Sequence, residues 1–211
     1  MFTPLVDILR CPNAHEETWL VASIDRADAR DILDGTLGCP ICLAEYPIRA
    51  GVVRFAEVVA PTSIPAHEHD AVRLAAALDL TDARMTALLH GAWGALAPIL
   101  RGESPAQLLL VNPPADISSG DGVSILTAET APVARGSVDA VAVGADASDA
   151  MLASLVASLK AGARVVGPIA RALPEGLTEL ARDEEIWVAQ LETPAASRPV
   201  PIARSARRPG Q

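Results

Sequence analysis

Apolar residues between His67 and Leu100 recur at spacings of three and four positions, which is the period of an amphipathic helix. Thr81 interrupts this pattern, and threonine is a residue type that commonly caps the start of a helix. The pattern therefore predicts two helices in this stretch. The first would bury Val72, Leu74, Ala75, Leu78 and Leu80, and the second Met85, Leu88, Leu89, Trp93, Leu96 and Leu100.

From Gln107 onward, short and continuous apolar runs alternate with turns, a pattern typical of strands covered on both faces. A helix is expected at 149–159, and the residues Lys160, Ala161 and Gly162 would end it. Strand, helix and strand in that order predict an α/β fold with a parallel sheet and a right-handed crossover. The expected strands are 108–111, 123–126, 138–143, 164–169 and 186–191.

Two prolines in the segment 60–66 (Ala-Pro-Thr-Ser-Ile-Pro-Ala) indicate a linker between two units. Residues 1–59 hold all three cysteines and form a small N-terminal domain, while 67–192 form the α/β domain. The last segment, 193–211, carries only arginines as charged residues, and we expect it to be a flexible basic tail.

Half of the 211 residues are hydrophobic and 20% are charged, a balance that excludes disorder as the main state. The longest stretch without a formal charge, between Arg84 and Arg101, is too short for a membrane span. The low cysteine content and the absence of a secretory leader predict a cytoplasmic protein. The net charge of −9 argues against broad nucleic-acid binding.

The cysteines follow a pattern that is typical of zinc sites. Cys39-Pro-Ile-Cys42 is a Cys-x-x-Cys turn that offers two thiolates to a tetrahedral ion. Cys11 makes a third ligand, and His15 is the candidate for the fourth. The alternatives are the relic of a lost site and a redox dithiol, although no thioredoxin-like strand precedes the pair.

The surroundings of the cysteines resemble a known family: the small zinc-ribbon activator subunit of tRNA and protein methyltransferases, with its short bacterial relatives. The resemblance covers about residues 1–57. That family has a second cysteine where this chain has Ala14, so three cysteines and His15 remain as metal ligands. The resemblance implies a protein partner, either a methyltransferase or a second copy of this chain, that contacts residues 46–55. The alternative is that these residues only pack the core of the ribbon. The residues that carry the resemblance are 5–12 (Leu-Val-Asp-Ile-Leu-Arg-Cys-Pro), 35–42 (Gly-Thr-Leu-Gly-Cys-Pro-Ile-Cys) and 46–55 (Tyr-Pro-Ile-Arg-Ala-Gly-Val-Val-Arg-Phe).

The second half resembles a class I S-adenosylmethionine-dependent methyltransferase in residues 128–141 and 155–166. The resemblance implies a Rossmann-like sheet. In this family a Gly-x-Gly-x-Gly loop follows the first strand, because the amino-acid end of the cofactor presses against bare backbone. With 108–111 taken as the first strand, its loop begins Asn112-Pro113-Pro114, and prolines remove N–H donors there. The interval before Val123 is also short, so a strand and its flanking helices are expected to be trimmed.

These departures predict a non-catalytic, methyltransferase-like protein with a zinc-ribbon head, acting as a protein-interaction or regulatory module. Zinc is then the expected cofactor, and S-adenosylmethionine is not expected to bind. Asn112 and Glu129 are the only candidates for cofactor contacts, and no catalytic residue is assigned. His90 is interpreted as a packed or half-exposed histidine rather than a base, and the acidic run 183–185 as a solvated edge.

Two alternatives stay open. The first is an active S-adenosylmethionine-dependent methyltransferase with an atypical cofactor loop. The second is a self-contained fusion, in which the ribbon shields a face or an edge of the second domain. A homodimer is compatible with each of them.

Overall fold

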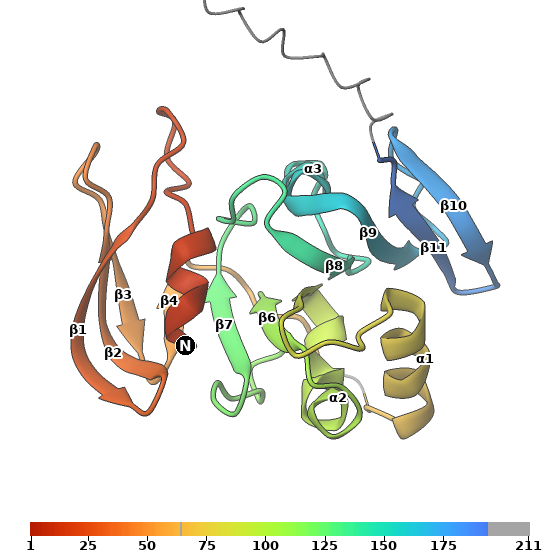
Figure 1. The fold of residues 1–211 in the computed structure, drawn as a ribbon, viewed down its shortest axis with the longest axis horizontal. Helices are drawn as coiled ribbons and strands as arrows, with labels where there is room; N and C mark the ends of the chain where they lie inside the picture. Colours follow the sequence, from red (N-terminus) through yellow and green to blue (C-terminus); the bar gives the residue numbers. More distant parts are fainter. Residues whose placement is uncertain (64, 194–211) are drawn as a thin grey trace, which may run out of the picture.

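The computed structural model describes residues 1–63 and 65–193, so the expected tail lies outside the described residues apart from Thr193. The described residues contain a single sheet of eleven strands in the order β1-β2-β3-β4-β7-β6-β5-β8-β9-β11-β10 (Figure 1). The first four strands form one end of this sheet, and the remaining seven form an α/β layer. The structure thus confirms a mixed α/β fold with a parallel sheet.

The N-terminal part is an antiparallel meander preceded by a 3-10 helix, η1 (Thr3–Ile8). Strand β3 alternates between exposed and buried side chains, and Tyr46 and Ile48 point into the core. Ala50 and Gly51 connect β3 to β4 with positive φ angles of 49° and 76°, as a tight hairpin turn requires. The strands are β1 (Val21–Asp28), β2 (Asp31–Gly38), β3 (Glu45–Arg49) and β4 (Val52–Arg54).

The α/β part contains five parallel strands in the order β7-β6-β5-β8-β9. Numbered along the chain from β5, this is 3-2-1-4-5, the order of a Rossmann sheet. Strand β11 runs antiparallel to β9, and β10 pairs with β11 at the edge. The strands are β5 (Thr86–His90), β6 (Gln107–Val111), β7 (Val123–Thr127), β8 (Val138–Ala142), β9 (Leu159–Pro168), β10 (Leu177–Arg182) and β11 (Ile186–Leu191).

Helices cover both faces of this sheet. On one face, α1 (Glu68–Leu78), the 3-10 helix η2 (Gly91–Leu96) and α2 (Ala97–Glu103) bury apolar residues against β5 and β6. On the other face, α3 (Asp149–Ser158) and η1 share a second hydrophobic cluster with the N-terminal meander. No helix in the described part of the chain is long and apolar enough to span a membrane.

Of the two helices predicted between 67 and 100, the first corresponds to α1. The prediction of the second helix is wrong. Residues 86–90 form strand β5, which lies at the centre of the parallel sheet. Its short apolar run satisfies helical spacing as well as strand burial, and periodicity alone does not separate the two. Gly91 then takes a positive φ of 66°, which ends the strand and redirects the chain into η2.

The expected loss of a strand is also wrong, because all five parallel strands are present. What the described chain lacks is a helix after β6 and after β7, whose connections 112–122 and 128–137 contain only turns and single bridges. The segment 108–111 belongs to β6 and is therefore the second parallel strand rather than the first.

The meander joins the α/β part through direct strand pairing. Strand β4 pairs in parallel with β7, and Val53 stands opposite Leu126. The buried cluster on this face contains residues of both parts, among them Tyr46 and Val53 from the meander and Leu126 from β7. The N-terminal part therefore covers the edge that β7 would otherwise expose.

Candidate functional site

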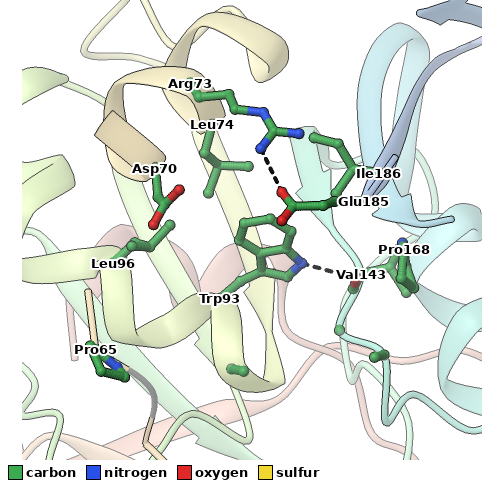
Figure 2. A pocket seen from close by; sticks show the side chains of 13 residues that line it. Pro65, Asp70, Arg73, Leu74, Trp93, Leu96, Val143, Pro168, Glu185 and Ile186 are labelled. Carbon is green, nitrogen blue, oxygen red and sulfur yellow. Dashed lines mark hydrogen bonds and ion pairs between the residues drawn. The ribbon is translucent and has the colours of Figure 1, made fainter. Parts of the chain in front are cut away.

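The order of the parallel strands reverses at β5, with β6 on one side and β8 on the other. In open α/β sheets, ligands bind in the crevice outside the carboxyl ends of the strands at such a switch point. A pocket of about 380 Å³ lies there, between α1, the loop after β5, the loop after β8 and the start of β11 (Figure 2). Its position and size match those of small-molecule sites.

Trp93 forms a large apolar wall of the pocket (Figure 2). Its indole N–H donates a hydrogen bond of 3.0 Å to the carbonyl oxygen of Val143, which holds the ring between the first-strand loop and the β8 end. Leu74, Leu96 and Ile186 complete the apolar lining. A planar apolar group would therefore find a preformed contact surface here.

The polar groups of the pocket come from α1 and from the start of β11. Arg73 donates to Glu185 Oε2 at 2.8 Å and also pairs with Asp183, so it ties α1 to the β10–β11 hairpin. Asp70 lies one turn before Arg73 on the same helix and lines the pocket as well. The prediction that 183–185 is only a solvated edge is therefore incomplete, because Glu185 is part of the pocket wall.

Glycines at the switch point are closely approached by other side chains. A Cβ atom on Gly91 or on Gly144 would lie 2.6 Å from Asp146 Oδ1, and one on Gly94 would lie 2.6 Å from the Cβ of Pro113. The open part of the site is therefore formed by Ala92 and Trp93 on one side and by 143–145 on the other. Sequence reasoning missed these residues because it placed a helix across β5; the Gly91 and Gly94 spacing after an apolar run was the available signal.

His90 is 3% exposed at the end of β5, and its Nδ1 has no hydrogen-bond partner among the described residues. Asp146 Oδ1 lies 3.8 Å away from this nitrogen. Burial lowers the pKa of His90; Asp146 opposes this effect, while Arg171 adds to it. The interpretation of His90 as a packed histidine agrees with its burial.

We expect the lowered pKa of His90 to make folding stability depend on pH. As the pH falls, the imidazole of His90 is protonated in the unfolded chain before it is protonated in the folded chain. The free energy of unfolding is therefore unaffected by this group above about pH 6.5 and decreases below it. The decline should reach at most about 1.4 kcal/mol per pH unit. Urea unfolding of His90→Gln should lack this slope between pH 6.5 and 5.5, whereas His67→Gln, at an exposed histidine, should keep it.

The two residues predicted to contact a cofactor lie away from the pocket lining. Asn112 donates through Nδ2 to the carbonyl oxygen of Ala128 at 2.8 Å and accepts from the Ala128 N–H at 2.9 Å. Its side chain thus joins the ends of β6 and β7. Glu129 is exposed in the loop that follows β7. As cofactor contacts, both residues stay predictions.

The structure brings together all four predicted metal ligands. The ligand atoms of Cys11, His15, Cys39 and Cys42 lie within 4.8 Å of one another. The Sγ atoms of Cys11 and Cys42 are 3.7 Å apart, and Cys39 Sγ is 3.4 Å from His15 Nε2. Zinc bond lengths in a tetrahedron place two sulfur ligands about 3.8 Å apart, and a sulfur and a nitrogen about 3.5 Å apart. The cluster thus has the dimensions of a zinc site.

Neighbouring groups orient the His15 ring and favour the thiolate of Cys42, whereas burial raises the pKa of Cys11. The Nδ1 of His15 lies 2.6 Å from the backbone oxygen of Glu16, a contact that directs Nε2 toward the cysteines. The backbone N–H of Ala44 and the Asn13 amide lower the pKa of Cys42 to about 6, which favours the thiolate that binds metals.

No protein-family model and no curated protein sequence matches this chain. Several solved structures are similar to part of this chain. A putative S-adenosyl-L-methionine-dependent methyltransferase from Methanococcus maripaludis matches 61% of this chain and 85% of its own, at 11% identity and a TM-score of 0.45. A SAM-dependent methyltransferase from Aquifex aeolicus matches 57% and 88%, at 12% identity and 0.40. The 1,6-didemethyltoxoflavin-N1-methyltransferase of Burkholderia thailandensis, with bound S-adenosylhomocysteine, matches 81% of this chain and 99% of its own. Its sequence identity is 12% and its TM-score is 0.40.

The prediction of a non-catalytic protein is contradicted. It rested on prolines after the first strand, but Pro113 and Pro114 follow β6, the second parallel strand. The first strand, β5, runs instead into a loop with Gly91 and Gly94. The ground for excluding S-adenosylmethionine, two prolines in the loop after the first strand, is therefore absent. The resemblance of 1–57 to the activator family has no counterpart in these comparisons.

Proposed function

We propose that this chain is an S-adenosylmethionine-dependent methyltransferase, and that methyl transfer takes place in the pocket at the carboxyl ends of β5 and β8. The observation that carries the proposal is the position of this pocket at the switch point of a sheet in Rossmann order. The loop after the first strand forms one of its walls, and the loop after β8 forms the facing wall.

The size and the apolar lining of the pocket are compatible with the cofactor. The volume of about 380 Å³ falls within the usual range for small-molecule sites. Ala92 and the segment 143–145 would hold the cofactor. When bound, S-adenosylmethionine supplies an electrophilic methyl group on a sulfonium centre. Leu74, Leu96 and Ile186 keep water away from the reacting groups.

S-adenosylhomocysteine should bind the protein with one-to-one stoichiometry in isothermal titration calorimetry. Replacing Ala92 by phenylalanine fills the pocket wall, so we expect Ala92→Phe to bind at least about tenfold more weakly, a loss of about 1.4 kcal/mol. Ala76→Phe is the matched control, because Ala76 is exposed on α1 and outside the pocket. Undetectable binding to the native protein, or equal binding to both variants, would contradict the proposal.

We also infer that the N-terminal part stabilises the methyltransferase domain of the same chain. The parallel pairing of β4 with β7 and the shared buried cluster support this reading, which corresponds to a self-contained fusion. One zinc ion, held by Cys11, His15, Cys39 and Cys42, would stabilise this part. The meeting of four ligand atoms favours a metal over a redox dithiol. A separate protein partner and a homodimer stay predictions.

A further inference from the structure

The switch-point pocket contains two carboxylates, Asp70 and Glu185, and one permanent cation, Arg73. The guanidinium of Arg73 is already shared between Glu185 and Asp183, which lies just outside the pocket lining. The charge of Glu185 is thus compensated inside the protein. Asp70 has no arginine or lysine partner among the described residues, and its one ionic contact is with the exposed ring of His69 at 3.0 Å.

Asp70 is placed to meet a ligand rather than bulk water alone. Its carboxylate points from α1 toward the hollow beside Leu96 and Trp93 (Figure 2). The side chain is only 34% exposed, so solvent screens its charge less than at an open surface. The facing indole of Trp93 offers an electron-rich ring to a cation.

We propose that the acceptor bound in this pocket is a small amine or nitrogen heterocycle on a flat apolar body. It binds as its cation, and its nitrogen becomes a nucleophile only after it has released its proton to solvent. Asp70 is the counter-ion of the nitrogen, and Trp93 with Leu74 contacts the apolar body. The uncompensated carboxylate disfavours anions of the same shape, which is how a site discriminates by charge. This inference rests on the proposed function, because it names the acceptor class of that same site.

The experiment compares two probes of similar shape and opposite charge, phenethylamine and 3-phenylpropionate, by calorimetry or ligand-observed NMR on the full chain at pH 7. Phenethylamine should bind about tenfold tighter than 3-phenylpropionate, a difference of about 1.4 kcal/mol. Asp70→Asn should abolish this preference. Glu68→Gln should keep it, because it removes the same charge from the same first helical turn but lies outside the pocket.

Equal binding of the two probes to the native protein overturns the inference, whatever the variants do. Loss of the preference in both variants also overturns it, since the effect would then come from the general charge of α1. Binding of S-adenosylhomocysteine separates the two proposals. Native protein that binds this nucleoside without charge preference refutes the acceptor class alone, and cation binding without nucleoside binding refutes the proposed function alone.

Discussion

Replacing Val53 by aspartate is expected to destabilise the whole chain by about 4 kcal/mol, because a buried charge without a partner has a cost of this order. Val53 has no exposed surface and stands opposite Leu126 where β4 pairs with β7. The carboxylate would enter the cluster that the meander and the α/β part share. Urea unfolding followed by circular dichroism measures the change, and the native chain should unfold in one transition.

Val59→Asp is the matched control, because Val59 is 95% exposed and follows the same strand by a few residues. We expect it to unfold within about 0.5 kcal/mol of the native protein, as surface substitutions usually do. If both variants unfold alike, or if the two parts of the native chain unfold in separate transitions, the N-terminal part does not stabilise the α/β part. The prediction thus tests the self-contained fusion directly.

Much of the α/β layer could be predicted from the local pattern of apolar residues along the sequence. The runs that became β6, β7, β8 and β11 are predominantly apolar, as expected for strands buried on both faces. Strand β5 was not predicted because its five residues fit the period of a helix as well as that of a strand. Only its pairing with β6 and β8 shows that it is a strand. Because β5 was not predicted, β6 was taken as the first strand. The loop after β6, rather than the loop after β5, was therefore compared with the cofactor loop of the methyltransferases.

The pairing of β4 with β7 could not be predicted from the sequence. Strand β4 has three residues, and its partner lies about seventy residues further along the chain. Such a pairing depends on how well two preformed surfaces fit, and no local propensity encodes that fit. The resemblance to a zinc-ribbon family implied a partner strand edge, but nothing in residues 1–59 shows whether that edge belongs to the same chain.

The metal ligands were within reach of sequence analysis, because the Cys-x-x-Cys turn sets the distance between two thiols. The direction of the His15 ring was not, since it depends on the oxygen of Glu16 and on the position of Cys39 in the fold. The acidic groups of the pocket were also missed. Asp70 and Glu185 are 115 residues apart in the sequence and line the same pocket because α1 lies beside the start of β11.

The purified protein is expected to contain one zinc ion per chain, and removal of this ion should lower the melting temperature. Cys11 and Cys39 are buried in the same cluster as Tyr46 and Leu9, so the metal holds core residues rather than a surface loop. Because the site exists only in the folded chain, the binding free energy of zinc adds to folding stability. Metal analysis and thermal unfolding with and without a chelator measure both effects.

His15→Ala tests the fourth ligand. It should weaken zinc binding at least about tenfold, since even the outer partners of zinc ligands contribute about 10–100-fold. Competition with a chromophoric chelator gives this ratio. His67→Ala is the control at an exposed histidine outside the cluster and should leave the affinity unchanged. Equal affinities would exclude the imidazole from the coordination sphere, and a metal-free protein with unaltered melting would show that packing alone holds the three cysteines together.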